Sequence, residues 1–150
     1  TEIYTLSLHD ALPIYPVTYV SWYGATAFAD VHGWRLPEAS EWQGVANYDG
    51  TYLYGCGTTI STSKANSMSS LHPYGTTVVG AFGTYGYGMA DMAGNVWEWT
   101  NSCYYPSCNP EGYHIRGGSW SNSEYDATVT RQGFGGTTTM DAHFGFRVCR

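Results

Sequence analysis

The chain has 150 residues, of which 43% are hydrophobic and only 12% are charged, and its formal net charge is −6. This length suits one globular domain with a hydrophobic core and leaves little room for two. Phosphate binding needs a basic surface, and the 6 Lys and Arg residues form no cluster, so neither nucleic acid nor an anionic membrane is expected as a partner. No apolar run approaches the ~20 residues of a membrane-spanning helix, so membrane insertion is not expected.

The first residues of the chain, 1–14, show no clear periodicity. We expect them to be a non-native or disordered leader, with a short strand as the alternative, and we expect the domain itself at residues 15–150. The chain has neither an initiator Met nor a signal peptide, so we expect a mature form or a fragment. An extended run from Pro16 leads to Ser21, a good helix N-cap, and apolar residues follow at helical spacing until Gly33, which predicts a first core helix.

A second helix is predicted after the segment 34–37, with Pro37 in its first turn. Its buried stripe would comprise Ala39, Trp42, Val45 and Ala46. Arg35 and Glu41 lie at its start; a catalytic pair is possible, but we favour a structural ion pair. After Asn47 the residues are mainly Gly, Tyr, Thr and Ser, which predicts long loops and no third long helix.

The stretch 88–100, GMADMAGNVWEWT, has a Gly-Asn turn between two acids, Asp91 and Glu98. Burying either carboxylate beside two indole rings costs several kcal/mol unless a positive group or strong hydrogen bonds compensate. Calcium prefers carboxylate and carbonyl oxygens, so these residues favour a calcium site. The alternative is that both acids only accept backbone hydrogen bonds across the turn.

The chain has 4 cysteines, which permit three pairings. The even count in a loop-rich chain favours disulfides and an oxidising, extracytoplasmic or secreted location. Cys103 and Cys108 are the local candidate pair, whereas Cys56 and Cys149 are far apart in sequence. A zinc site is less favoured, because Cys103 and Cys108 lack the CxxC spacing and no His pair completes four ligands.

Four ordered segments carry a family resemblance over about residues 15–150. The segment DMAGNVWEW resembles the most recognisable motif of the formylglycine-generating enzyme (sulfatase-modifying factor) family. The others are PVTYVSWYGATAFADVHGWRLPEASEWQ, KANSM, and RGGSW followed by GFRVCR. The resemblance implies an α+β variant of the C-type lectin fold, with two helices near the N-terminus, short antiparallel strands and long loops. Variable proteins of diversity-generating retroelements use the same fold.

The resemblance also implies calcium ligands. One structural calcium would use two side chains and two backbone carbonyls, those of Asp91, Glu98, Gly94 and Val96. Asn66 matches a residue of a first calcium site in family members. The acid that supports that site is missing here, since no Asp or Glu occurs between Asp49 and Asp91.

In active family members, two cysteines after RGGS bind copper(I), which needs soft thiolate ligands. At the matching positions this chain has Asn122 and Ala127. Copper and the family's oxidative chemistry are therefore not expected, although Ser119 and Trp97 keep the positions that line that pocket.

The segment 120–134 has the composition of a binding surface, because Tyr and Trp give large contacts and Ser, Asn and Thr give adaptable hydrogen bonds. A solvated surface without a ligand is the alternative. The candidate ligand-binding residues are Trp120, Asn122, Glu124, Tyr125, Asp126, Arg131 and Phe134.

Two functions from different classes remain. The first is a noncatalytic, calcium-stabilised module, expected to be a monomer, that binds a protein or a glycan. The second is an oxidoreductase, either a formylglycine-generating or a nonheme-iron-associated enzyme domain, whose remaining parts lie outside this chain.

Overall fold

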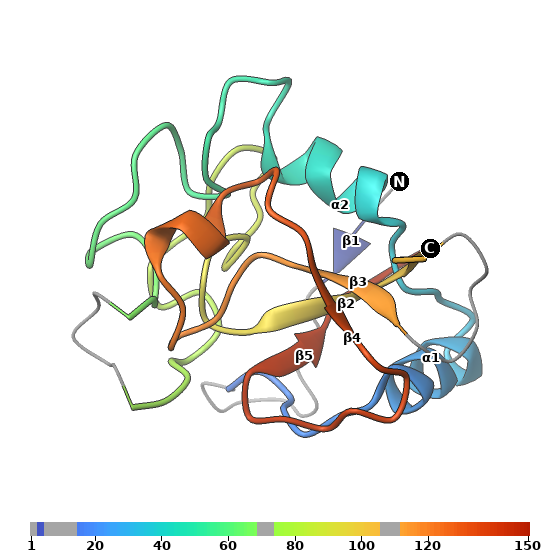
Figure 1. Ribbon diagram of the computed structural model, residues 1–150. Coiled ribbons are helices and arrows are strands. Elements are labelled where there is room, and N and C mark those ends of the chain that lie inside the picture. The colour runs from blue at the N-terminus through green and yellow to red at the C-terminus, as the bar shows by residue number, and fades with distance from the viewer. Residues whose placement is uncertain (1–2, 5–14, 69–73, 106–111) are drawn as a thin grey trace.

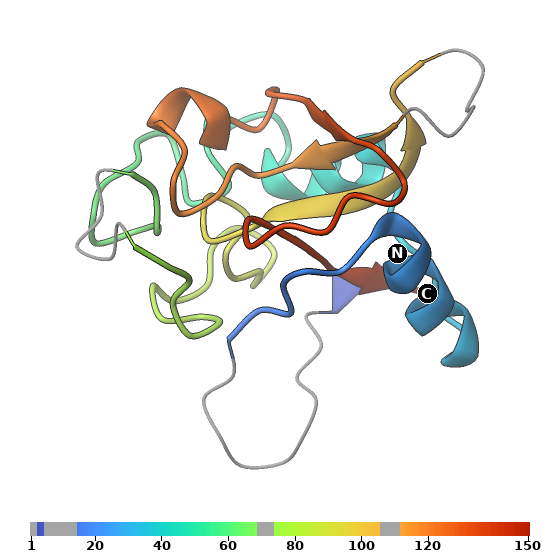
Figure 2. The same ribbon diagram turned by 60° about the horizontal axis from the view of Figure 1, so that its bottom comes forward.

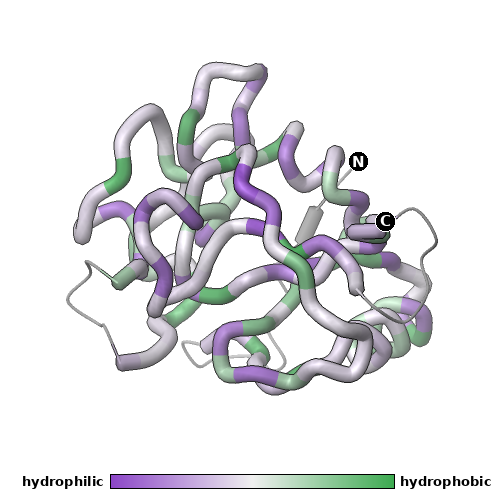
Figure 3. The backbone as a smooth tube through the Cα atoms, viewed as in Figure 1, coloured by the Kyte–Doolittle hydropathy of each residue, from purple (hydrophilic) through white to green (hydrophobic). Residues whose placement is uncertain are grey.

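A computed structural model describes residues 3–4, 15–68, 74–105 and 112–150. Long loops connect short elements (Figure 1), and hydrophobic positions are scattered among hydrophilic ones along these loops (Figure 3). In the described residues, no helix has the length and apolar character needed to cross a membrane. The elements are β1 (Ile3–Tyr4), α1 (Trp22–Val31), α2 (Ala39–Ala46), β2 (Trp97–Cys103), β3 (Tyr113–Arg116), the 3-10 helix η1 (Glu124–Ala127), β4 (Gly133–Gly135), β5 (Phe144–Phe146) and β6 (Val148–Cys149).

Both predicted helices are present. The hydroxyl of Ser21 accepts a hydrogen bond from the N–H of Gly24 at 3.1 Å and caps α1, and Gly33 follows the helix with a φ of 67°. The prediction for Pro37 was wrong, because α2 begins at Ala39 with Glu38 as its N-cap, so Pro37 precedes the helix. In the described residues no third long helix occurs.

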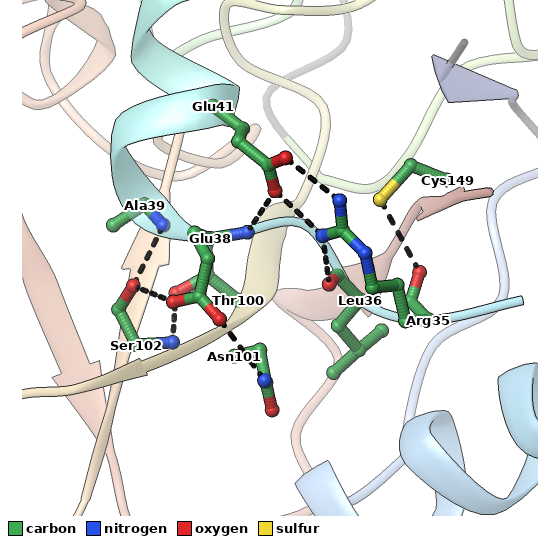
Figure 4. Close-up of polar contacts among 9 residues, drawn as sticks. All are labelled: Arg35, Leu36, Glu38, Ala39, Glu41, Thr100, Asn101, Ser102 and Cys149. Carbon is green, nitrogen blue, oxygen red and sulfur yellow. Dashed lines mark hydrogen bonds and ion pairs between the residues drawn. The ribbon is translucent and has the colours of Figure 1, made fainter. Parts of the chain in front are cut away.

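The start of α2 is attached to β2 by a polar network (Figure 4). The Ser102 hydroxyl accepts from the N–H of Ala39 at 2.8 Å and donates to the carboxylate of Glu38 at 2.5 Å. Asn101 donates to the same carboxylate at 3.0 Å. Because an unpaired N–H at a helix start is costly when buried, these contacts fix both the beginning of α2 and its position on the sheet.

An ion pair joins the segment before α2 to its first turn (Figure 4). The guanidinium of Arg35 donates two hydrogen bonds to Glu41, at 2.6 and 2.7 Å. The hydrogen bond from Arg35 lowers the pKa of Glu41 to about 2. These contacts agree with the structural interpretation of the pair.

The main sheet has the strand order β4-β3-β2-β5. The pairs β2–β3 and β3–β4 are antiparallel as expected, but β5 runs parallel to β2, so the sheet is mixed. A separate antiparallel pair joins β1 to β6, with Ile3 opposite Cys149. Thus the described part of the leader, Ile3–Tyr4, is a strand; the rest of residues 1–14 lies outside the described residues.

Alternation along β2 sends its side chains to opposite faces of the sheet. Trp97 and Trp99 pack in a cluster with Ala25 of α1, and Ile115 of β3 belongs to the same cluster. Glu98 lies on the other face, where its carboxylate meets Trp42 of α2. Figure 2 shows α1 and α2 on opposite sides of the sheet. The carboxylate of Glu98 is therefore buried between the sheet and α2.

Candidate functional site

The Gly-Asn turn connects three loops through the side chain and backbone of Asn95. Its side-chain oxygen accepts from the N–H of Thr77 at 2.9 Å, its N–H donates to the carbonyl of Asn66 at 2.7 Å, and its carbonyl accepts from the N–H of Trp120 at 3.0 Å. Asn95 is 1% exposed and has a φ of 68°. The sequence indicated the turn, but not that Asn95 ties these loops together.

Glu98 is compensated by an arginine. Glu98 is 4% exposed, and its carboxylate accepts hydrogen bonds from Nε and Nη2 of Arg147, both at 2.5 Å, and from Nε1 of Trp42 at 2.5 Å. Arg147 is 2% exposed, so the pair is buried on both sides. The sequence did not indicate that Arg147 compensates Glu98, although Arg147 lies in the GFR motif.

The expected calcium ligands fit the structure only in part. Asp91 accepts from the N–H of Gly80 at 2.7 Å, and burial, which outweighs this hydrogen bond, raises the pKa of Asp91. The positive charge of Arg147 and a hydrogen bond with Asn95 act in the opposite direction and lower the pKa of Asp91. Glu98 fits less well, because Arg147 engages both of its oxygens.

The remaining expected metal ligands lie close to this turn. Gly94 forms an isolated parallel bridge with Asn66, whose side chain donates to the carbonyl of Gly75 at 2.9 Å. Val96 follows Asn95 and is buried. Among residues 3–4, 15–68, 74–105 and 112–150, no three His, Cys, Asp or Glu side chains gather as a metal site. A calcium here would thus depend on backbone carbonyls and Asp91.

Three of the four expected pocket residues meet at one atom. The side-chain oxygen of Asn122 accepts from Nε1 of Trp97 at 2.7 Å and from the hydroxyl and N–H of Ser119 at 2.6 and 3.2 Å. Asn122 therefore holds the indole ring and the serine by hydrogen bonds, at a position that the sequence resemblance assigns to a copper-binding thiol. An oxygen acceptor with three donors has no capacity left for soft copper(I).

Ala127 is 1% exposed and packs in a cluster with Cys56, Ala65 and Ala93. Cys56 is a free thiol, and burial raises its pKa to about 11. A thiol with this pKa is protonated at neutral pH in the absence of a metal.

A second free thiol within the described residues is that of Cys149. Cys149 is free and buried, and its thiol lies 3.6 Å from the carbonyl of Arg35. The expected Cys103–Cys108 disulfide stays a prediction, because Cys108 lies outside the described residues.

Four of the expected ligand-binding residues form what we call the η1 cluster: Glu124, Tyr125, Asp126 and Arg131. Tyr125 is 67% exposed, and the guanidinium of Arg131 lies over its ring, 5.2 Å from the centroid. Arg131 also pairs with Asp126 at 3.4 Å. An exposed tyrosine held by an arginine presents a large and partly preorganised contact area.

The other expected ligand-binding residues pack elsewhere. Phe134 lies on β4 and is 50% exposed, and its ring centroid is 4.7 Å from that of Tyr104. Trp120 stacks on His143 with centroids 4.7 Å apart, and the side chain of Asn122 is engaged with Trp97 and Ser119. The sequence analysis missed Tyr104 and His143, because neither lies within the segment 120–134.

The two helices on opposite faces of a small mixed sheet, with the Gly-Asn turn hydrogen-bonded to the RGGSW segment, define an α+β domain of the C-type lectin kind. The chain belongs to the family described as "Sulfatase-modifying factor enzyme 1-like domain", which matches residues 5–150. This result confirms the family expected from the sequence.

Among similar proteins, "Serine/threonine-protein kinase pkn1" of Chlamydia caviae is 35% identical, over 91% of this chain and 24% of that protein. "Formylglycine-generating enzyme" of Mycobacterium tuberculosis is 36% identical, over 61% of this chain and 35% of that protein. "Inactive C-alpha-formylglycine-generating enzyme 2" of Mus musculus is 30% identical, over 88% of this chain and 48% of that protein. The chain thus spans less than half the length of each.

Solved structures agree on the fold. "Treponema denticola variable protein 1" superposes with a TM-score of 0.79 at 20% identity, over 89% of this chain and 70% of that one. "Structure of PvdO from Pseudomonas aeruginosa" gives a TM-score of 0.78 at 22% identity, over 93% of this chain and 63% of that one. At such identities the comparison carries the fold alone.

Proposed function

We propose that this domain is a noncatalytic ligand-binding module, and that a protein or a glycan binds at the exposed η1 cluster. The observation that carries the proposal is the position of Asn122, whose oxygen accepts three hydrogen bonds from Trp97 and Ser119. A side chain committed in this way stabilises the former pocket instead of binding copper. The exposed aromatic and basic side chains of the η1 cluster are suited to contact a ligand, and we assign the binding role to them.

The comparisons support a binding role. One relative carries the word "inactive" in its name, and two structural neighbours are titled "variable protein" and "Major Tropism Determinant". The kinase name belongs to a protein of which this chain spans 24%, so kinase activity is not proposed for this domain.

The second candidate function is an oxidoreductase domain that works with parts outside this chain. Trp97 and Ser119 are retained and in contact with the residue at the copper position, and relatives named formylglycine-generating enzyme support it. The copper-dependent form of this chemistry would need thiolates that residues 122 and 127 do not supply.

Oxidation of a cysteine-containing peptide separates the two functions. With copper and O₂, we expect the unmodified chain to leave the peptide thiol unchanged in mass spectrometry, because it lacks the two thiolate ligands. The Asn122→Cys/Ala127→Cys double variant restores both ligand types and is the matched comparison; each single variant and copper alone are the controls. Oxidation by the unmodified chain above the copper-only rate would overturn the noncatalytic assignment.

Binding through the η1 cluster is tested with panels of immobilised glycans and of extracellular proteins. For any ligand that binds, Tyr125→Ala and Arg131→Ala are each expected to weaken binding about tenfold, as central aromatic and arginine contacts do. Tyr23→Ala removes another exposed tyrosine, 54% exposed on α1, and as the matched control it should leave the affinity unchanged. Equal affinities of all three variants would place the ligand elsewhere.

We also propose a structural calcium at Asp91, with the carbonyls of Gly94 and Val96 as further ligands. At about 100 times its Kd, calcium would raise the melting temperature by about 5 °C or more, because only the folded state binds it. Differential scanning calorimetry with calcium and with a chelator measures this shift. Asp91→Asn should abolish the shift, and an equal melting temperature in both buffers would remove calcium from the proposal.

A further inference from the structure

An exposed aromatic cluster lies at one end of the main sheet and shares no residue with the η1 cluster. It comprises Tyr104 and Tyr105, directly after β2, and Phe134 of β4, and we call it the β4 cluster. Their exposed fractions are 39%, 41% and 50%. The ring centroid of Tyr104 lies 5.0 Å from that of Tyr105 and 4.7 Å from that of Phe134, so the three rings form one continuous surface.

The sheet holds the β4 cluster in place. Phe134 lies opposite His114 in the register of β4 and β3, and the ring centroid of His114 lies 5.0 Å from that of Tyr104. The next residue of β4, Gly135, faces the other side of the sheet, where a Cβ would overlap the ring of Trp99. The backbone of β4 thus packs directly on the core, so Phe134 is held on the outer side and loses little freedom when a ligand binds.

The chemistry and the size of the β4 cluster favour a small uncharged ligand. The three rings carry no charge, and burial, together with the positive charge of Arg116, lowers the pKa of His114, so this histidine is neutral at neutral pH. With ~250 Å² for a whole aromatic residue, the exposed fractions leave on the order of 300 Å² of the cluster open to solvent. Each partner of a standard protein interface contributes ~800 Å². The cluster is therefore too small to hold a protein by itself, but it can cover the face of a sugar ring.

We propose that the β4 cluster binds an uncharged glycan, and that a pyranose ring stacks on Phe134 and Tyr104. A pyranose ring has a face of C–H groups with a small positive charge, and the face of an aromatic ring carries the negative part of its quadrupole. The hydroxyls of Tyr104 and Tyr105 can donate to and accept from the sugar hydroxyls at the edge of the pyranose ring. This site is additional to the one proposed at the η1 cluster and does not depend on what that cluster binds.

Calorimetric titration with cellohexaose, mannohexaose and chitohexaose as uncharged probes, and with hexagalacturonate as the charged probe, tests the proposal. We expect at least one uncharged probe to bind, and hexagalacturonate to bind about tenfold or more weakly. Phe134→Ala and Tyr104→Ala should each weaken binding of the uncharged probe about tenfold, as the loss of a central aromatic contact does. Phe134→Tyr keeps the ring and should keep the affinity, whereas Phe134→Leu keeps an apolar side chain without the ring and should lose it. Urea unfolding of each variant checks that it folds.

Tyr125→Ala is the matched control, because Tyr125 is also an exposed tyrosine, at 67%, but belongs to the η1 cluster. It should leave binding of the uncharged probe unchanged. If Tyr125→Ala weakens binding and Phe134→Ala does not, the glycan lies at the η1 cluster, which overturns the second site and supports the first. If both weaken it, one site spans the two clusters, and the separate site is rejected.

Three further results would overturn the proposal: no binding of any uncharged probe, equal affinity for hexagalacturonate, or full affinity in Phe134→Leu. Conversely, a chain that binds a probe through Phe134 but binds no ligand through Tyr125 would lose the proposed site at the η1 cluster and keep this one. The two proposals can therefore fail separately.

Discussion

Replacing Arg147 with Met is expected to lower the free energy of unfolding by about 3–5 kcal/mol, because removal of one partner leaves a buried charge without compensation. Glu98 is 4% exposed and Arg147 is 2% exposed, so water cannot substitute for the lost guanidinium. Trp42 would remain as a single donor to Glu98. Urea unfolding followed by tryptophan fluorescence measures the change.

The exposed ion pair at α2 gives the matched control. The side chains of Arg35 and Glu41 are 42% and 28% exposed, and such a pair contributes about 0–1 kcal/mol. Arg35→Met should therefore have a small effect, although it also removes a guanidinium that donates two hydrogen bonds to a carboxylate. The Glu98→Gln/Arg147→Met double variant should recover most of the loss, since neither member of the pair then carries a charge. Equal losses for Arg147→Met and Arg35→Met would show that Glu98 is not held by its buried counter-charge.

The helices could be predicted because their signals are local. Ser21 before a run of apolar residues at helical spacing and Gly33 after it specify α1 without reference to other parts of the chain. The position of Pro37 could not be predicted, because the start of α2 depends on Ser102 and Asn101 of β2, which lie far away in sequence. A helix start that is fixed by tertiary contacts leaves no complete local pattern.

The candidate site could be predicted where it depends on the motif, but not where distant residues complete it. Trp97, Ser119 and Asn122 do meet, as the order of the motifs implied. The sequence indicated that Glu98 needed a positive group or strong hydrogen bonds. It did not show that Arg147 is this group, because a side chain, a metal ion or backbone donors can each compensate a carboxylate. β5 pairs in parallel with β2, and this pairing brings Arg147, the residue after β5, to Glu98. Only the three-dimensional fold therefore shows that an arginine compensates the carboxylate.

The segment 120–134, predicted as a ligand-binding surface, shows a further property that composition alone does not predict. The uniform composition of the segment 120–134 suggests a single surface. In the fold, Tyr125 packs with Arg131, whereas Phe134 packs with Tyr104. Composition therefore predicts which residues are exposed and aromatic better than which of them act together.

Gly94→Ala is expected to destabilise the domain by more than about 3 kcal/mol, through strain and a steric clash together. Gly94 has a φ of 74°, and a Cβ at this position would lie 2.1 Å from the carbonyl oxygen of Asn66. That oxygen also accepts a hydrogen bond from the N–H of Asn95 at 2.7 Å. The new methyl group would therefore push apart the loop of Asn66 and the turn on which Asp91 and Glu98 depend.

Comparison with Gly88→Ala isolates the steric part of this effect. Gly88 has a φ of 82°, but a Cβ there would meet no atom within 4 Å, so only the left-handed backbone penalty of about 1–2 kcal/mol applies. The difference between the two variants in urea unfolding measures how strongly the close approach of Asn66 and Gly94 stabilises the turn. If both variants lose the same free energy, the two loops separate without cost, and the turn must be held by Asn95 and its hydrogen bonds to Thr77 instead.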